Sequence, residues 1–133
     1  MTNGQQLFVA YGVIAITYGV LLGSALAAVR ASTPEAPKHL VTTHLEGLMQ
    51  GPMHLSLAFA VGITGFDSGT ATVAAVLLVI GSGLNLLGNL TNWLTGTGDQ
   101  FAERSPGFLL NAASGPLITV GAVITSIGVL TNL

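Results

Sequence analysis

The chain has 133 residues, of which 50% are hydrophobic and only 6% are charged, and its mean hydropathy is +0.75. A soluble domain carries about 25% charged residues, so a soluble fold with this composition would lack the side chains to cover its surface. The three Lys/Arg residues are too few for a nucleic-acid surface, and the absence of Cys excludes disulfides, thiolate metal ligands and Cys nucleophiles. We therefore expect a single-domain integral membrane protein, residues 1–133, that contacts lipid and not nucleic acid.

Four apolar segments follow one another along the chain, covering residues 7–29, 41–64, 70–94 and 108–130. As a helix, each is long enough to cross about 30 Å of hydrocarbon. No basic residues precede the first segment, as they would in a secretory signal, so we expect this segment to be retained as a span. Strands of a membrane barrel would instead have about ten residues of alternating polarity. The pattern predicts an all-α bundle of four transmembrane helices.

Short polar connections separate these segments. All three basic residues, Arg30, Lys38 and Arg104, lie in the first and third connections, and none lies in the second connection or at the termini. The positive-inside rule therefore places those two connections in the cytoplasm and both termini outside. We expect a multi-pass protein of the plasma (inner) membrane of the cell.

The second segment concentrates polar and ionisable side chains. Glu46, Gln50 and His54 follow at intervals of four residues and so share one side of a helix. That side is continued by a further histidine and two glycines, His44, Gly47 and Gly51. An ionisable group in hydrocarbon costs about 2.5–3.5 kcal/mol, so it normally faces a cavity or a partner. We predict a functional site at His44, with His54 as a weaker candidate, and Glu46 as a group that only forms a hydrogen bond near the helix start.

Further polar positions lie in the other segments. Asn85, Asn89 and Asn92 form a stripe in the third segment, and Tyr11 and Tyr18 share one face of the first. Asparagine stripes also hold membrane helices together, so a purely structural interpretation of Asn85 and Asn92 stays open beside the functional one. The two tyrosines are expected to be packing or interface anchors.

The residue types restrict the chemistry of the predicted site. Three histidines without a thiolate do not favour a closed tetrahedral zinc site, and the chain has no phosphate-binding loop. One histidine on a helix, with glycines that allow a flat group to approach closely, suits haem ligation better. Haem ligation at His44 is therefore a hypothesis at this point, and Gly47, Gly51 and His54 are further candidate cofactor contacts.

At these residues the chain resembles the styrene oxide isomerases, small bacterial membrane enzymes with four spans. The resemblance covers about residues 43–130. The family has a histidine at the start of its second span and Asn-Gly six residues later, where this chain has His44 and Gln50-Gly51. Similar short matches follow in the turn after that span, in the third span and in the last connection: Gly65-Phe66-Asp67, Thr70-Ala71, Asn85 and Asp99-Gln100-Phe101.

The resemblance implies a four-helix bundle assembled as a homotrimer, with haem b held between neighbouring subunits. It also implies that ferric haem acts as a Lewis acid on an apolar epoxide and that the product is a carbonyl compound. His44 would be the axial ligand, and Gln50 would take the role of the amide that contacts the epoxide oxygen. Asn89 falls about where the family has a tyrosine that also contacts this oxygen, and Asn85 falls at a family asparagine. An amide is not an acid comparable to a phenol, so Asn89 departs from the family pattern.

Two other functions are compatible with the same residues. The first is a haem protein of another role, a carrier or an electron-transfer subunit. A second histidine opposite His44 would favour electron transfer, and His54 is the only nearby candidate. The second is a non-enzymatic membrane scaffold in which the polar stripes only hold helices together.

Overall fold

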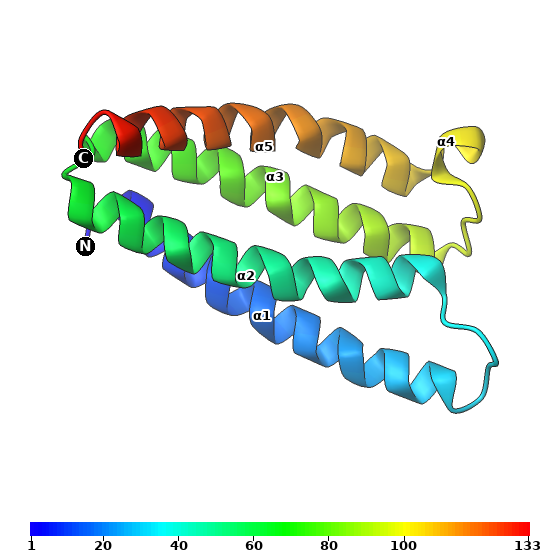
Figure 1. Ribbon diagram of the computed structural model, residues 1–133. Coiled ribbons are helices and arrows are strands. Elements are labelled where there is room, and N and C mark those ends of the chain that lie inside the picture. The colour runs from blue at the N-terminus through cyan, green and yellow to red at the C-terminus, as the bar shows by residue number, and fades with distance from the viewer.

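The computed structural model describes all 133 residues, and the chain forms helices and no strands. Four helices are long: α1 (Asn3–Arg30), α2 (Lys38–Thr64), α3 (Ser68–Leu94) and α5 (Pro106–Leu130). They run alternately in opposite directions, so both termini lie at one end of the molecule and the 31–37 and 95–105 connections lie at the other (Figure 1). A short helix, α4 (Gln100–Glu103), interrupts the 95–105 connection. The expected all-α fold class is confirmed.

Three of the long helices, α1, α3 and α5, are long and apolar enough to cross a membrane. Helix α2 is of similar length, but its stripe of polar side chains makes it less apolar than the other three. The four predicted segments all correspond to long helices, and three of them have the composition of a membrane span.

Side-chain caps determine where α1 and α3 begin. Thr2 and Gln5 form a reciprocal capping box, so α1 begins at Asn3 and not at the first apolar residue of the predicted segment. Asp67 accepts a hydrogen bond from the Thr70 amide at 2.8 Å and caps α3, which leaves only residues 65–67 between α2 and α3. Gly65 ends α2 with a φ of 66°, a conformation that glycine adopts without strain.

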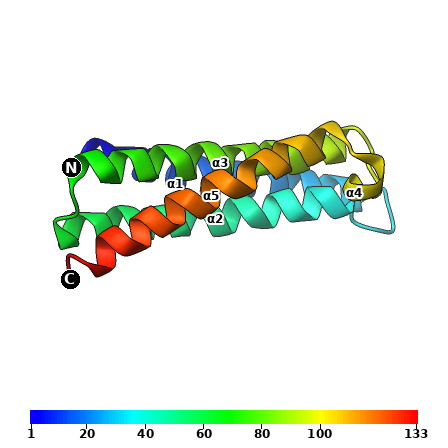
Figure 2. The same cartoon turned by 90° about the horizontal axis from the view of Figure 1, so that it is seen from above.

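The helices pack as two close pairs, α1 with α2 and α3 with α5 (Figure 1). Seen from above, α5 runs obliquely across the bundle (Figure 2). Glycines allow the close approach in both pairs. A Cβ atom at Gly47 would lie 2.9 Å from the Ala15 carbonyl oxygen, and one at Gly121 would lie 3.0 Å from the Ala74 carbonyl oxygen. Contacts this short explain why small residues occupy the helix interfaces.

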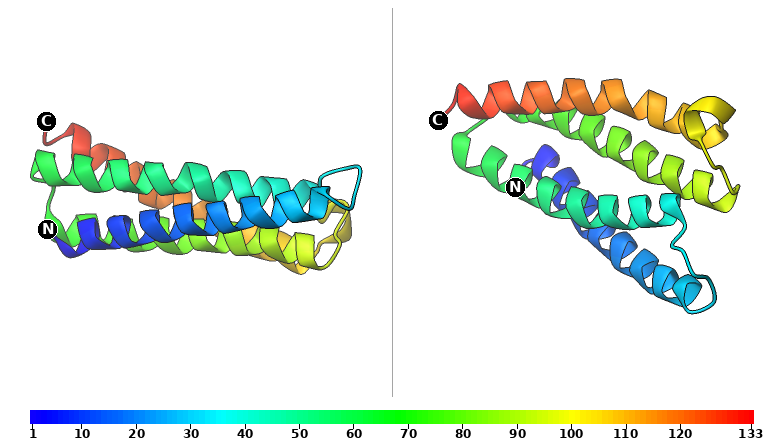
Figure 3. Two further views of the ribbon diagram at one scale, coloured as in Figure 1. Left: turned by 90° about the horizontal axis from the view of Figure 1, so that it is seen from below. Right: turned by 45° about the vertical axis from the view of Figure 1, so that its right-hand side comes forward.

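The interior changes in character along the bundle. Next to the termini it is apolar, with buried residues from α1, α2 and α3 and from the turn between α2 and α3: Phe8, Ala58, Val61, Phe66, Ala71, Ala75 and Leu78. Toward the 31–37 and 95–105 connections, polar groups replace them, and α1 diverges from the other helices (Figures 1 and 3). The candidate site residues lie in this wider half and in the middle of the bundle.

Candidate functional site

His44 lies on α2 against α1. Its Nδ1 atom is 2.7 Å from the Gly19 carbonyl oxygen, and the ring lies so close to Gly23 that a Cβ there would be 2.7 Å from Cε1. A carbonyl oxygen only accepts, so Nδ1 carries the proton and Nε2 keeps its lone pair. Nε2 has no hydrogen-bond partner and is not enclosed. A histidine that donates one ring N–H to a backbone carbonyl and leaves the other nitrogen free has the arrangement typical of metal ligands.

Gln50 lies on the same helix, six residues after His44. Its Oε1 accepts a hydrogen bond of 2.8 Å from the Tyr11 hydroxyl, which fixes the amide, while Nε2 has no partner and is not enclosed. The spacing places Gln50 about 9 Å along the helix from His44 and about 120° around it. The two free groups of one chain therefore point in different directions.

His54 is fully buried and lies apart from His44. Its Nδ1 atom is 2.8 Å from the Gln50 carbonyl oxygen, and its ring packs against Tyr11 and Phe8 with centroid distances of 4.5 and 5.8 Å. Ten residues of helix separate the two histidines by about 15 Å. The structure does not bring His54 to His44, so the two histidines of one chain cannot coordinate one metal ion.

Gly47 and Gly51 face α1. A Cβ at Gly47 would lie 2.9 Å from the Gly19 Cα atom, and one at Gly51 would lie 2.9 Å from the Gly12 carbonyl oxygen. Within one chain the space next to these glycines is filled by α1 and not open to a cofactor. Their position brings α1 close enough for the Gly19 carbonyl to reach His44.

Asn89 belongs to an extended set of hydrogen-bonded side chains. Its Nδ2 atom donates to Glu46 Oε2 at 2.8 Å, and its Oδ1 atom accepts from Asn111 at 3.4 Å. Asn85 lies next to the same Glu46 carboxyl group. The side chain of Asn89 is only 4% exposed, and both ends of its amide have partners. The structure therefore places Asn89 between α2 and α5, away from the free Nε2 atom of His44.

The hydrogen bonds continue from Asn111 toward the last connection. Gln100 Oε1 accepts from Asn111 and from Asn92, at 2.9 and 2.8 Å, and the Ser105 hydroxyl donates to Asn92 Oδ1 at 2.6 Å. We call the four residues Asn89, Asn92, Gln100 and Asn111 the amide network. It joins α3, α5 and the short helix α4, which fits the structural interpretation of Asn92.

Sequence analysis missed several polar partners in this region. The Tyr18 hydroxyl lies 2.9 Å from Thr43 Oγ1 and 3.4 Å from the Leu86 carbonyl oxygen, and the Tyr11 hydroxyl holds Gln50. The seven-residue interval between the tyrosines indicated a shared face. It did not indicate that this face is turned toward α2 and α3.

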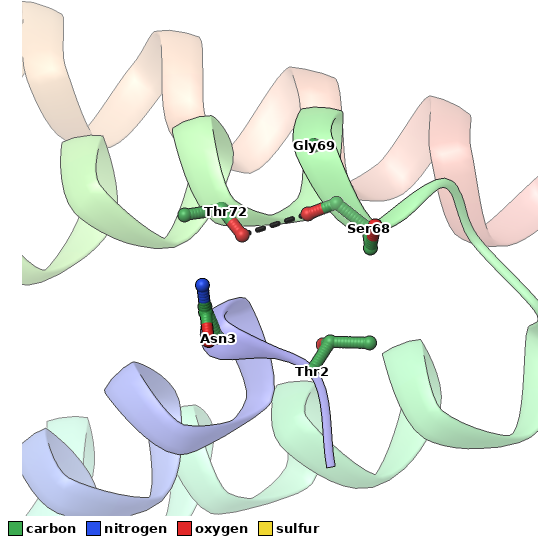
Figure 4. Close-up of a pocket in the computed structure, with 5 residues that line it drawn as sticks. All are labelled: Thr2, Asn3, Ser68, Gly69 and Thr72. Carbon is green, nitrogen blue, oxygen red and sulfur yellow. Dashed lines mark hydrogen bonds between the residues drawn. The ribbon is translucent and has the colours of Figure 1, made fainter.

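None of the hollows in the molecular surface includes His44. The largest, of about 540 Å³, lies at the end of the bundle that holds the termini, and the residues around it are polar or glycine: Thr2, Asn3, Ser68, Gly69 and Thr72 (Figure 4). A groove of about 170 Å³ between α1 and α3 is lined by Tyr11, Tyr18 and apolar residues. A group bound at His44 would thus lie on the outer surface of a single chain.

The donor set restricts which metal could bind. No three His, Asp or Glu side chains lie together as ligands for one metal ion. One imidazole with a free Nε2 fits a metal that arrives with most of its ligands already in place, as iron does in haem. Searches of protein-family models, curated proteins and solved structures found no match to the chain.

Proposed function

We propose that the chain is a haem b-dependent epoxide isomerase of the plasma membrane. The observation that supports this most directly is the His44 imidazole, whose Nδ1 proton is donated to the Gly19 carbonyl and whose Nε2 is free and accessible. The resemblance of the His44 and Gln50-Gly51 region to the styrene oxide isomerases supports the proposed reaction, the isomerisation of an epoxide. The proposed substrate is an apolar epoxide that enters from the bilayer, and the proposed product is its carbonyl isomer.

The proposal includes α2 as a fourth span. The polar side chains of α2 face α1 and α3, while its opposite side exposes large apolar side chains: Leu45, Met49, Met53, Phe59 and Ile63. A helix with this distribution can sit in lipid, because its apolar side faces outward and its polar side faces the other helices of the bundle.

The proposal includes assembly as a homotrimer, and the positions of the two site residues support a site shared between copies. The side chains of His44 and Gln50 in one chain point in directions about 120° apart around the helix. They therefore cannot both contact the same small bound molecule from one side. A haem held between subunits would accept His44 from one copy and meet Gln50 of a neighbouring copy. A second copy would also cover a haem that otherwise lies on the outer surface.

The chemistry divides between the cofactor and the chain. When bound, ferric haem would supply a Lewis acid for the ring opening of the epoxide. His44 would hold the iron, and its hydrogen bond to Gly19 orients the ring and makes Nε2 a stronger electron-pair donor. Gln50 donates its free N–H to the substrate oxygen, and Tyr11 holds the amide in that orientation. In the proposed assembly, the neighbouring copy and the lipid would exclude water, which would otherwise open the epoxide to a diol.

Asn89 takes a different role from the tyrosine at this position in the family. Its donor is engaged with Glu46 and its acceptor with Asn111, so in this proposal Asn89 and its neighbour Asn85 position other groups and do not contact the substrate. The chain then has one direct hydrogen-bond donor to the epoxide, Gln50.

The experiment compares two histidines of α2. His44→Gln removes the proposed ligand, whereas His39→Gln alters a histidine that is only 6% exposed and whose Nε2 is enclosed. We expect the first variant to lose haem and the conversion of a panel of aliphatic and aromatic epoxides to aldehydes or ketones. The second should keep both. Equal haem content in the two variants would contradict the proposal.

A non-enzymatic scaffold is the second candidate, because the amide network joins three helices and has the character of a structural element. In that case His44→Gln would leave assembly, cofactor content and epoxide conversion unchanged from the wild-type protein.

A further inference from the structure

His54 is a buried polar side chain in the middle of α2 that the isomerase proposal does not use. The residue is 0% exposed, and its Nδ1 atom lies 2.8 Å from the Gln50 carbonyl oxygen. Because a carbonyl oxygen only accepts, Nδ1 carries the proton and Nε2 keeps its lone pair. Nε2 is enclosed and has no hydrogen-bond partner. The ring therefore presents an unused acceptor to the interior of the bundle.

Ser82 on α3 is a second buried group of this kind. The residue is 0% exposed, and its hydroxyl is enclosed and has no hydrogen-bond partner. One turn earlier on α3, the Leu78 carbonyl lies beside the His54 ring without forming a hydrogen bond to it. In a regular α-helix the backbone N–H of Ser82 donates to this same carbonyl. The unused hydroxyl of Ser82 thus lies close to the unused acceptor of His54.

Tyr11 on α1 forms a third side of this cluster. Its ring packs against His54 with a centroid distance of 4.5 Å, and its hydroxyl lies beside that of Ser82. The Tyr11 hydroxyl donates its proton to Gln50 Oε1 at 2.8 Å, so its oxygen can only accept from any further partner. Tyr11 therefore cannot supply the donor that His54 Nε2 requires.

The packing of α1 against α3 is loose next to the cluster. Near the termini a Cβ at Gly4 would lie 2.8 Å from the Ala71 carbonyl oxygen, whereas one at Gly83 would have no contact closer than the Tyr11 ring, at 3.9 Å. A groove of about 170 Å³ is lined by Tyr11 and Gly83 at this point. Gly83 directly follows Ser82, so a small molecule can approach the cluster between these two helices.

The donors and acceptors of the cluster determine which molecule fits. His54 Nε2 and the Leu78 carbonyl both accept, and the Ser82 hydroxyl can donate. One water molecule can accept from Ser82 and donate its two protons to the two acceptors. Buried waters typically form about three hydrogen bonds of this kind, to polar groups that otherwise have no partner.

We infer that the middle of the bundle holds an internal water molecule, bound between His54 Nε2 on α2 and the Ser82 hydroxyl on α3. The inference gives His54 a partner within its own chain. It does not depend on haem, because His54 lies about 15 Å along α2 from His44.

Solid-state NMR of the full-length protein in lipid bilayers tests the inference. Histidine is labelled with ¹⁵N and ¹³C, and the signals of His54 are identified by their loss in His54→Asn. We expect the His54 ring to carry its proton on Nδ1 alone and to receive magnetisation from water protons. A ring with its proton on Nε2, or a ring that receives no magnetisation from water, would overturn the inference.

Two variants show whether Ser82 binds the water. Ser82→Val removes the hydroxyl and adds methyl groups where the water would lie, so transfer from water to the His54 ring should fall to background. Thr125→Val is the matched control, because Thr125 is 1% exposed and its hydroxyl already donates to the Gly121 carbonyl at 2.8 Å. This control should leave the transfer unchanged. Equal transfer in Ser82→Val and the wild type would contradict binding by Ser82.

A crystal structure of the wild-type protein decides the question if Ser82→Val does not fold. The inference expects an ordered peak at about 2.7–3.2 Å from both His54 Nε2 and Ser82 Oγ. A direct hydrogen bond between these two atoms, with no such peak, would overturn it. These outcomes are the same whether or not the protein binds haem.

Discussion

At the scale of single residues, the position of His44 depends on a glycine in the facing helix. The imidazole lies over Gly23 and donates to Gly19, and both contacts require that α1 carry no side chain there. The sequence predicted a site at His44 because a histidine and several glycines share one side of α2. It did not identify Gly19 and Gly23, because spacing within one helix does not tell which residues of another helix lie opposite.

Gly23→Ala tests this dependence. The added Cβ would be 2.7 Å from His44 Cε1, so the ring must move and its hydrogen bond to Gly19 is broken or lengthened. Loss of such a supporting partner weakens metal binding by about 10–100-fold, and we expect haem titration to measure a decrease of this size. Gly115→Ala is the matched control, because nothing lies within 4 Å of a Cβ at that position. Equal haem affinity in the two variants would mean that Gly23 does not set the position of His44.

Tyr11→Phe tests the orientation of Gln50. The substitution removes the hydroxyl that donates to Gln50 Oε1 at 2.8 Å and keeps the ring that packs on His54. We expect haem content to remain as in the wild type and the isomerisation rate to decrease by about five- to tenfold, which corresponds to about 1 kcal/mol for one hydrogen bond. Tyr18→Phe removes a hydroxyl that does not contact Gln50 and should leave the rate closer to that of the wild type. An isomerisation rate unaffected by Tyr11→Phe would show that the hydrogen bond from Tyr11 does not orient Gln50 for the reaction.

At the scale of helices, the sequence predicted where the long elements lie and was less accurate about where they begin. Apolar segments locate the hydrocarbon-crossing part of a helix, whereas the first turn is determined by polar caps outside that part. Thr2 and Asp67 extend α1 and α3 beyond the predicted limits in this way. The short helix α4 was not predicted, because four residues are too few to show a helical pattern of apolar residues.

Ser105→Ala is expected to destabilise α5. Ser105 accepts from the Phe108 amide at 3.0 Å as the N-cap and donates to Asn92 Oδ1 at 2.6 Å, and it is 5% exposed. Loss of a cap costs about 1 kcal/mol, and a buried amide left without its partner adds about 1–3 kcal/mol. Thermal unfolding in detergent, followed by circular dichroism, should give a lower midpoint. Ser32→Ala, in the exposed first connection, should change the midpoint little, and an equal decrease in both variants would contradict this role of Ser105.

The Asp67 cap predicts a pH effect on α3. Hydrogen bonds from the Thr70 amide and hydroxyl lower the pKa of the exposed Asp67 carboxyl group below its usual value. Its contribution to stability is therefore present above the pKa of the unfolded chain and is lost as the pH falls through the lower, folded-state pKa. Asp67→Asn keeps a capping oxygen but does not titrate, so the difference in unfolding midpoint between the two proteins should change in the acidic range and be constant near neutral pH. A constant difference throughout would show that Asp67 does not titrate in this way.

At the scale of the whole molecule, the structure combines an apolar exterior with polar groups that face inward. Leu45, Met49 and Phe59 are on the outside of α2, while His54 is buried and the half-buried Glu46 and Gln50 form hydrogen bonds to α3 and α1. The sequence predicted the polar side of α2 as a unit, but the structure divides it. His44, Gly47 and Gly51 contact α1, and Glu46 reaches α3. Helical periodicity predicts which residues share one side of a helix. The arrangement of the neighbouring helices determines which other residues each of them contacts.

The absorption spectrum of the full-length protein tests the central claim most directly. The protein is expressed with a haem supply, purified in detergent and compared with His44→Gln prepared in the same way. We expect a Soret band in the wild-type protein with the spectrum of high-spin ferric haem, because His54 lies too far from His44 to provide a second ligand in the same chain. The band should be lost in His44→Gln. A wild-type protein without a Soret band, or a variant with an unchanged one, would contradict haem binding at His44.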